Sequence, residues 1–233
     1  MKSCLKFAAL LAFAASASGT HAARSDVSVD PAQTWFGYVA IFDLPADGGA
    51  FRFSEFHGAD TAKLPGGFAG PVAWLEPSRM GVFQGDTASP FFDFWWKADG
   101  SGGYGANKTV LNQLYVQNDG LAGSTVRFSG RALADTLTGP YTAHAFIADT
   151  VGDGYALHAR QTVPLVAGEA FSVSLEVAPG HHVGYGIEVF GPSSPDASLG
   201  SLGAVAVSAV PEPSAWLLMA MGGFGLIALR RRR

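Results

Sequence analysis

The chain has 233 residues, a formal net charge of −4, 12% aromatic residues and one cysteine. Between a basic N-terminal segment and an arginine-rich C-terminus, residues 23–209 carry nine Lys and Arg against 18 Asp and Glu, a formal charge of −9. This acidic balance argues against nucleic acid and against anionic polymers held by bulk charge, because both need a basic surface.

The first 22 residues have the build of a secretory signal peptide. Lys2 and Lys6 precede an apolar run from Phe7 to Ala17, and small residues follow at a signal peptidase site. We predict a signal helix over residues 1–22 that signal peptidase removes after Ala22, with Ala17 as the alternative position. Because Cys4 leaves with this segment, the mature chain has no disulfide and depends on core burial for stability.

Residues 23–209 predict one all-β domain, a two-sheet antiparallel β-sandwich that is jelly-roll-like. Short runs rich in Val, Phe, Tyr, Trp and Thr alternate with Gly, Pro, Asn and Asp, and no stretch sustains a helical period. The predicted strands are Trp35–Leu44, Ala50–Phe56, Val72–Leu75, Met80–Gln84, Phe91–Lys97, Thr109–Gln117, Thr125–Leu133, Tyr141–Asp149, Tyr155–Val163, Phe171–Val177, Val183–Phe190 and Ala204–Ser208. Tyr141–Asp149 has apolar side chains on both faces, which indicates a central strand.

The densest aromatic cluster is Phe91–Lys97. Read as a strand, it directs Asp93, Trp95 and Lys97 to one face, where a flat ring stands between a carboxylate and an ammonium. A ring covers the C–H face of a pyranose and the charged groups bind its hydroxyls, so we predict a glycan site there, with Trp35 and Trp74 as weaker candidates. The alternative is that Trp95 packs into the core.

Asp149 and Asp153 flank Gly152 in a predicted turn, and oxygen-rich turns of this kind hold Ca²⁺. They are the candidate ligands of a structural Ca²⁺, although Asp and Gly are also ordinary turn residues. His181 and His182 follow a Pro-Gly turn and are predicted to face solvent.

No catalytic signature accompanies these residues. The sequence has no Gly-x-Ser-x-Gly elbow, no cysteine nucleophile in the mature chain and no phosphate-binding glycine loop. The prediction is therefore that the protein is not an enzyme and uses no catalytic cofactor.

The C-terminal segment, residues 210–233, combines three features in a fixed order. Pro211-Glu212-Pro213 forms an open turn, residues 215–229 form an uncharged apolar run, and Arg230, Arg231, Arg232 and Arg233 end the chain. The run predicts a short transmembrane helix that contacts the membrane transiently, and the arginines keep its end on the cytoplasmic side.

This tail resembles a PEP-CTERM sorting signal. The resemblance implies recognition by an exosortase, a membrane transpeptidase that cuts near Pro-Glu-Pro and transfers the protein to a surface acceptor; an ordinary membrane anchor is the alternative. The same tail is also called the "ice-binding protein C-terminal" motif. Only Thr136 and Thr138 form a nearby threonine pair, so ice binding does not follow.

A second resemblance covers residues 91–207 through the runs LAGSTVRFSGRAL, PYTAHAFIADT, LEVAPGHHVGYGIEVFGPSSPD and LGSLGAV. They are similar to a β-sandwich of PEP-CTERM proteins that looks like carbohydrate-binding, galactose-binding-like jelly rolls. The combined expectation is an exported, exosortase-sorted protein of the cell surface, extracellular matrix or biofilm. It is expected to be adhesive or weakly glycan-binding, with an extracellular polysaccharide as partner. The alternatives are a purely structural coat protein and a membrane-anchored carbohydrate-active enzyme.

Overall fold

The computed structural model describes residues 23–58, 65–77, 86–193 and 201–210. The predicted signal helix, the predicted transmembrane helix and the predicted strand Met80–Gln84 lie outside these residues. Within them, no helix has both the length and the apolar character that crossing a membrane requires. The described strands form two six-stranded sheets and one two-stranded sheet.

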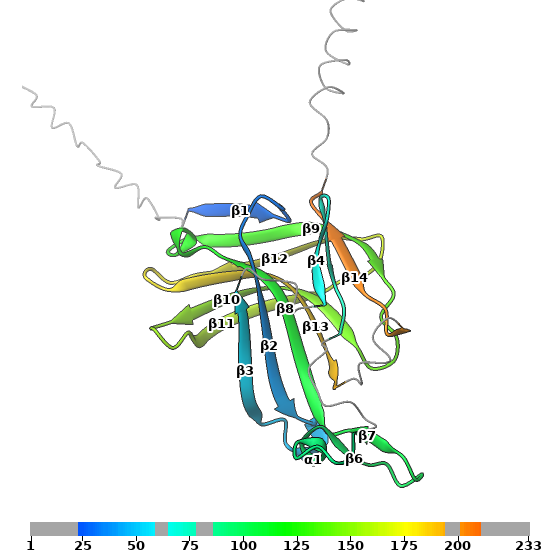
Figure 1. Cartoon of the computed structure of the whole chain (residues 1–233). Coiled ribbons are helices and arrows are strands. Elements are labelled where there is room, and N and C mark those ends of the chain that lie inside the picture. The colour runs from blue at the N-terminus through cyan, green and yellow to red at the C-terminus, as the bar shows by residue number, and fades with distance from the viewer. Residues whose placement is uncertain (1–22, 59–64, 78–85, 194–200, 211–233) are drawn as a thin grey trace, which may run out of the picture.

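Sheet A has the order β1-β9-β14-β5-β4, with β12 on the other edge of β9. Its strands are β1 (Arg24–Ser28), β4 (Gly66–Ala69), β5 (Val72–Leu75), β9 (Thr125–Asp135), β12 (Ala170–Glu176) and β14 (Val205–Ser208). Figure 1 shows β1 lying along β9, with which it pairs in parallel. The prediction of a wholly antiparallel sandwich is wrong at this pair, because β1 joins the edge of sheet A before the chain crosses to the other sheet.

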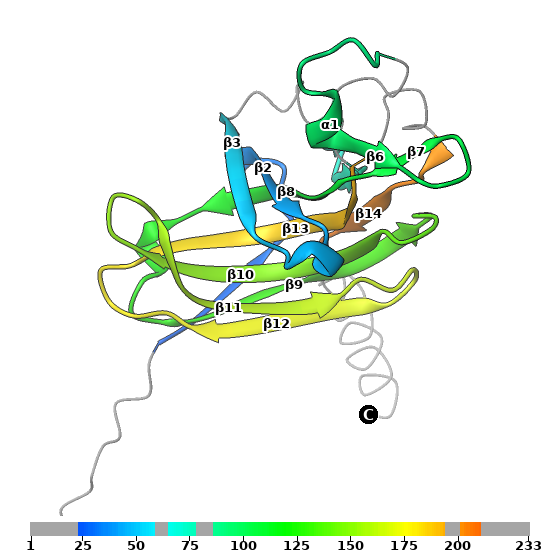
Figure 2. The same cartoon turned by 90° about the horizontal axis from the view of Figure 1, so that it is seen from below.

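Sheet B has the order β11-β10-β13-β8-β2-β3 and is antiparallel throughout. Its strands are β2 (Trp35–Asp43), β3 (Phe51–Gly58), β8 (Lys108–Gln117), β10 (Thr142–Val151), β11 (Ala156–Pro164) and β13 (His182–Pro192). Across the sheet the strand direction turns strongly, so that β2 and β3 run steeply across the direction of β10 and β11 (Figure 2). The twist follows from the right-handed twist of each strand.

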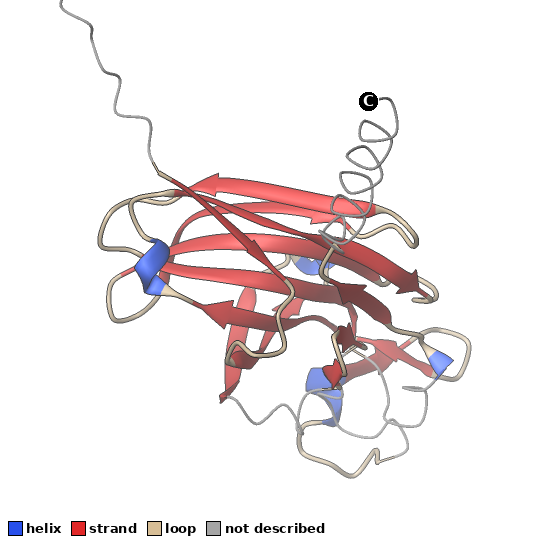
Figure 3. Cartoon of the chain, turned by 90° about the horizontal axis from the view of Figure 1, so that it is seen from above, coloured by secondary structure: helices blue, strands red, loops and turns tan. Residues whose placement is uncertain are grey.

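The remaining described elements are short. The helix α1 (Phe92–Trp95) leads into β6 (Trp96–Ala98), which pairs with β7 (Tyr104–Ala106). The 3₁₀ turns η1 (Pro45–Asp47) and η3 (Asp119–Leu121) complete the set, and Figure 3 shows the helical pieces as short blue segments among the red strands.

The core lies between sheets A and B. Phe128 of β9 contacts Tyr185 of β13 with ring centroids 5.4 Å apart, and Trp35 of β2 contacts Phe68 of β4 at 5.1 Å. Each pair joins one sheet to the other. The largest fully buried side chains are Tyr185, Phe128, Ile41, Leu75, Leu114, Ile147 and Ile187, and they come from both layers. This arrangement is that of a two-layer β-sandwich.

Ten of the predicted strands are confirmed, with both ends within two residues of the observed bounds. The strand prediction for Phe91–Lys97 is wrong: the chain makes one helical turn over residues 92–95 and then the short β6. As predicted, β10 is internal, between β11 and β13.

Candidate functional site

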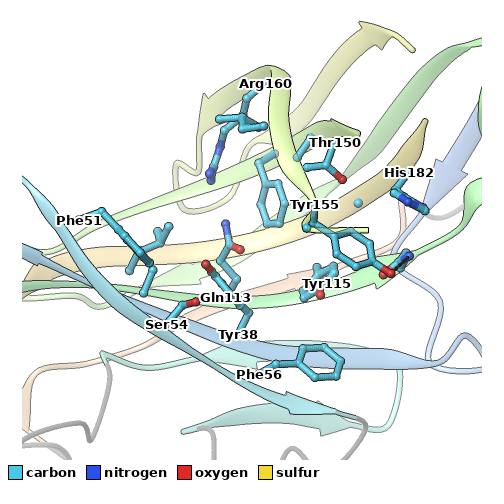
Figure 4. A pocket seen from close by; sticks show the side chains of 18 of the residues that line it. Tyr38, Phe51, Ser54, Phe56, Gln113, Tyr115, Thr150, Tyr155, Arg160 and His182 are labelled. Atoms are coloured by element: carbon cyan, nitrogen blue, oxygen red, sulfur yellow. Dashed lines mark hydrogen bonds between the residues drawn. The ribbon is translucent and has the colours of Figure 1, made fainter. Parts of the chain in front are cut away.

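A cavity of about 610 Å³ opens on the outer face of sheet B, away from the core. One wall comes from β2 and β3 and the other from β10, β11 and the turn between them (Figure 4). We call it the groove. Its lining residues are Tyr38, Ala40, Phe42, Phe51, Ser54, Phe56, Leu111, Gln113, Tyr115, Gln117, Phe146, Ala148, Thr150, Gly154, Tyr155, Leu157, Arg160, His182 and Gly184.

The groove is built by the strand period of two. In β8, Leu114 and Val116 belong to the core, whereas the alternate residues Gln113, Tyr115 and Gln117 line the groove. The outward side of a strand in a sandwich usually carries charged side chains, because it meets water. Here the outward side carries aromatic and uncharged polar side chains. Sheet B therefore has two usable faces, one packed on sheet A and one open to a ligand.

Four aromatic rings form a row on the outer face of sheet B, and all of them except Phe36 line the groove. The Tyr115 ring lies 5.9 Å from Phe36 and 6.5 Å from Phe146, and Phe36 lies 5.6 Å from Phe56. These rings come from β8, β2, β10 and β3, so each strand contributes one member. Phe56 keeps 58% of its surface exposed although it is large and apolar. The open face of Phe56 is available for stacking, whereas Phe146 is only 2% exposed and Tyr115 and Phe36 are half-buried.

The floor of the groove contains a hydrogen-bonded charge pair. Gln113 Nε2 donates to Glu188 Oε2 at 2.9 Å, and the Arg160 guanidinium donates to the same oxygen. Glu188 is only 5% exposed, so its charge needs this pairing. Arg160 also lies 4.9 Å from the centroid of the Phe146 ring, a cation–π contact. Arg160 thus presents its remaining donors at the groove surface in a fixed orientation.

Tyr155 overhangs one end of the groove. Its φ of 50° places it in the left-handed region, which is unfavourable for a bulky residue, and 51% of its surface is exposed. Its ring lies 4.6 Å from that of His182, and Gln117 Nε2 lies 3.4 Å from its hydroxyl. Backbone strain of this kind concentrates at ligand-binding positions.

His182 is held in turn by Asp119, whose Oδ2 lies 2.8 Å from His182 Nδ1. Burial raises the pKa of Asp119, but hydrogen bonds from His182, the Val183 backbone and Gln117 outweigh it and leave the pKa below its usual value. His182 is thus partly open to solvent, with 27% of its side chain exposed, and it is also held by a hydrogen bond.

Tyr115 stands at the centre of the row. Burial, with smaller contributions from Tyr155 and Tyr38, raises the pKa of Tyr115 to about 12. Its phenol stays neutral at physiological pH and acts as a donor or an acceptor. The groove therefore combines apolar ring faces with a few fixed polar groups, which is the usual chemistry of a small-molecule or oligosaccharide site.

The predicted glycan residues are not in the groove. Trp95 is 7% exposed and its ring contacts Phe94 and Phe53, so it has no open face for a sugar. The physical reason is the helical turn of α1, which directs Trp95 inwards and leaves Asp93 exposed. Lys97 is exposed and pairs with Asp47 at 3.1 Å. The structure thus separates the three residues that were predicted to act together.

The two weaker candidates also lie elsewhere. Trp35 is 5% exposed, packs on Phe68 and donates from Nε1 to the Asp30 carbonyl at 2.8 Å. Trp74 is half-buried in β5 of sheet A and belongs to a different layer from the groove.

The predicted Ca²⁺ ligands occupy different environments. Asp153 lies exposed in the β10–β11 turn, whereas Asp149 is fully buried at the end of β10. The Asp149 carboxylate contacts His181 Nδ1 at 2.7 Å and His158 Nδ1 at 3.1 Å. The prediction that His181 faces solvent is wrong, because this contact and the Ala178–His181 turn hold it against Asp149.

The sequence itself carries a signal for the groove. Tyr38, Tyr115 and Phe146 are aromatic residues on the outward side of strands whose inward side is already apolar. In β10 this two-sided pattern was read only as evidence for a central strand. Two-sided apolar strands at neighbouring positions of one sheet also indicate that the outer face binds something.

Comparison with known proteins identifies the C-terminal segment. Residues 209–233 match the family model of the PEP-CTERM protein-sorting motif, which confirms the predicted motif of Pro211, Glu212, Pro213 and the terminal arginines. The motif indicates an exported surface protein with an exosortase as its processing partner and a transient membrane stage. No curated protein matches the chain.

Proposed function

We propose that this exosortase-processed surface protein binds neutral glycan weakly in the groove, and that it acts as a non-catalytic adhesive component of the extracellular matrix. The observation that carries the proposal is the row of rings from four strands beside the hydrogen-bonded cluster of Gln113, Glu188 and Arg160. Rings cover the C–H faces of pyranoses, and the polar groups bind their hydroxyls.

The polarity of the groove favours a glycan over an apolar ligand. Ser54, Gln113, Gln117 and Thr150 are placed among the rings, and each offers a hydrogen bond that a lipid chain would leave unused. Unpaired polar groups lower affinity for apolar ligands. The single cation, Arg160, is already neutralised by Glu188, which disfavours a polyanion.

The groove's lining supports binding without catalysis. Among the described lining residues there is no Asp or Glu at the surface, whereas glycoside hydrolysis generally uses two carboxyl groups across the scissile bond. Glu188 lies behind Gln113 and Arg160, with an oxygen that accepts from both. An open groove with few fixed contacts favours weak affinity, which many copies on one surface would strengthen through avidity.

The test is binding of the exported protein to immobilised neutral polysaccharides, measured by affinity electrophoresis and a glycan array. Phe56→Ala and Tyr155→Ala each remove an exposed ring and should weaken binding about tenfold, which is about 1.4 kcal/mol. Leu133→Ala is the matched control, since Leu133 is 45% exposed on β9 of sheet A. Binding that survives both ring substitutions, or release of reducing ends from the glycan, would overturn the proposal.

A further inference from the structure

A second cluster lies at the end of the sandwich where β10, β11 and the β12–β13 turn meet. It contains Asp149, His158 and His181, whose ligand atoms all lie within 4.8 Å of one another. The Asp149 carboxylate is 0% exposed, and both imidazoles direct Nδ1 at it. The two rings stand nearly perpendicular, at 80°, with centroids 4.8 Å apart.

Local irregularities of the backbone bring the three residues together. The β10–β11 register shifts between Asp149 and Thr150, which leaves His158 unpaired in the ladder and free to turn towards Asp149. The β12–β13 turn contains Gly180 with φ +78°, a left-handed position that glycine adopts without strain, and delivers His181. A bulge and a tight turn therefore converge on one carboxylate.

The charge of Asp149 is otherwise uncompensated. Among the described residues, its ion pairs are only with His158 and His181, and its other partner is the Ala178 backbone N–H at 3.4 Å. A fully buried carboxylate without a permanent cation is unfavourable. The buried Asp43, by contrast, is paired with Arg52 and Lys108. A bound cation would supply at Asp149 the positive charge that Arg52 and Lys108 supply at Asp43.

We propose that Asp149, His158 and His181 bind a divalent transition-metal ion of the Zn²⁺ class. Two imidazole nitrogens and one carboxylate oxygen suit Zn²⁺, whereas Ca²⁺ takes six to eight oxygen ligands. The His158 side chain is 55% exposed, so a water molecule completes the fourth position from its side. This donor set replaces the Asp149–Asp153 pair that the sequence suggested for Ca²⁺.

The distances are compatible with such a site after a small adjustment. Metal bonds of ~2.0–2.1 Å in a tetrahedron separate neighbouring ligand atoms by roughly 3.3 Å. The contacts of 2.7 Å from His181 Nδ1 to Asp149 Oδ1 and of 3.1 Å from His158 Nδ1 to Asp149 Oδ2 would have to lengthen, the first by about 0.6 Å. The three ligand atoms, which lie within 4.8 Å of one another, would also have to draw together around the ion. The exposed His158 side chain has the freedom to make that change.

The ion would act as a structural cross-link. Asp149 and His158 belong to sheet B, while the turn that carries His181 leaves β12 of sheet A. A metal at this point ties the two layers together in a chain whose one cysteine lies outside residues 23–209. Because the metal binds the folded state, it raises the unfolding temperature in proportion to the logarithm of its free concentration.

The test uses the exported protein after chelator treatment and dialysis, titrated with Zn²⁺, Ca²⁺ or Mg²⁺ by calorimetry and thermal unfolding. We expect one Zn²⁺ per chain and a Tm that rises with free Zn²⁺, with no such rise for Ca²⁺ or Mg²⁺. His158→Ala should weaken Zn²⁺ binding at least tenfold. Because the His158 side chain is exposed, its removal should leave the fold intact. His144→Ala, on the same strand as Asp149, is the matched control.

A second readout does not depend on stability. Co²⁺ in place of Zn²⁺ should give the visible absorption of a four-coordinate site, and His158→Ala should abolish it. A stoichiometry of zero, equal stabilisation by Ca²⁺, or unchanged Co²⁺ absorption in His158→Ala would each overturn the proposal. Glycan binding to the groove is measured separately, so either proposal fails without the other.

Discussion

Two regions of the molecule are rich in aromatic residues, and they differ in what their rings face. One is the segment Phe91–Lys97, which contains α1 and most of β6 and has five aromatic rings in seven residues; we call it the cap. The other is the groove, whose rings come from separate strands of sheet B. In the cap, Phe92, Trp95 and Trp96 are at most 7% exposed and only Phe91, at its edge, is open, at 63%. In the groove, Phe56 and Tyr155 are more than half exposed, although Phe146 is 2% exposed.

The cap closes one end of the core. Trp95 contacts Phe94 edge-on with centroids 5.0 Å apart, and Phe92 contacts Tyr104 in the same way at 4.8 Å. Lys108 lies 4.6 Å from the centroid of the Phe94 ring and pairs with the buried Asp43. Figure 1 shows α1, β6 and β7 together at the end of the strands of sheet B. These rings are structural.

The difference shows how the spacing of aromatic residues along the sequence relates to the solvent exposure of their rings. Consecutive aromatic residues on a strand would point to both faces, and half of them would meet water. A helical turn followed by a short strand wraps such a run around one point, so adjacent rings pack on each other. Rings that are spaced along several strands and face the same side of the sheet instead form one row, in which a face such as that of Phe56 stays open. Concentration in the sequence thus favours packing, and dispersal at a fixed parity favours a binding surface.

The largest expected effect comes from exchanging one ring in each region for alanine. Trp95→Ala removes a buried ring and should lower the free energy of unfolding by about 3–5 kcal/mol. Phe56→Ala removes a 58% exposed ring and should change that energy by less than about 0.5 kcal/mol while it weakens glycan binding. Urea unfolding followed by tryptophan fluorescence and circular dichroism measures both.

The reverse pattern would contradict the comparison. Suppose that Trp95→Ala unfolded at the same urea concentration as the unmodified protein but lost glycan binding. The cap would then be the ligand site, and the groove would be a surface that packs against a protein partner.

Two glycines of β13 provide a finer test, because Gly184 lines the groove and Gly186 does not. A methyl group at Gly186 would overlap the Leu114 carbonyl oxygen and lie 2.6 Å from the Tyr115 Cα, so Gly186→Ala should cost about 1–3 kcal/mol. At Gly184 the nearest atom would be 3.5 Å away on the Tyr115 ring, an ordinary contact. Gly184→Ala should therefore leave Tm within about 2 °C and weaken binding by narrowing the groove over Tyr115.

One outcome for these two glycine variants would contradict the proposed position of the ligand. Gly184→Ala with unchanged stability and unchanged glycan affinity would show that the ligand does not approach Tyr115. That result would leave the outer rim around Phe56 and Tyr155 as the contact surface.

Much of the fold was predictable from the sequence because strand patterns are local. Alternation in runs such as Phe171–Val177 fixed strand positions to within two residues, and glycine turns marked where they end. The parallel β1–β9 pair was not predictable, because it depends on where a short polar segment docks after the chain has folded. The helical turn at Phe92–Trp95 was missed because four residues are too few to show a helical period.

The sites were less predictable than the fold, since they depend on register between distant strands. Tyr115 and Phe146 are 31 residues apart in the printed sequence, and their rings meet only because β8 and β10 both pair with β13. Likewise, His158 reaches Asp149 because of a β-bulge, and no local sequence pattern predicts that bulge. The C-terminal sorting motif was predictable in full because it is contiguous and is read as a linear segment.

The smallest expected effect is a late phenolic titration that sharpens the contrast between groove and solvent. Since burial raises the pKa of Tyr115 to about 12, above ~10 for an unfolded tyrosine, the folded state favours the neutral phenol. This contribution to stability is complete below pH ~10 and is lost as the pH rises from ~10 to ~12.

Phenolate absorbance of the folded protein should show tyrosines that ionise late, and Tyr115→Phe should remove one of them. Tyr185, whose pKa is also raised by burial, should remain. If glycan covers Tyr115, saturating ligand should move its titration to still higher pH; a titration indifferent to ligand would place the sugar away from the centre of the row.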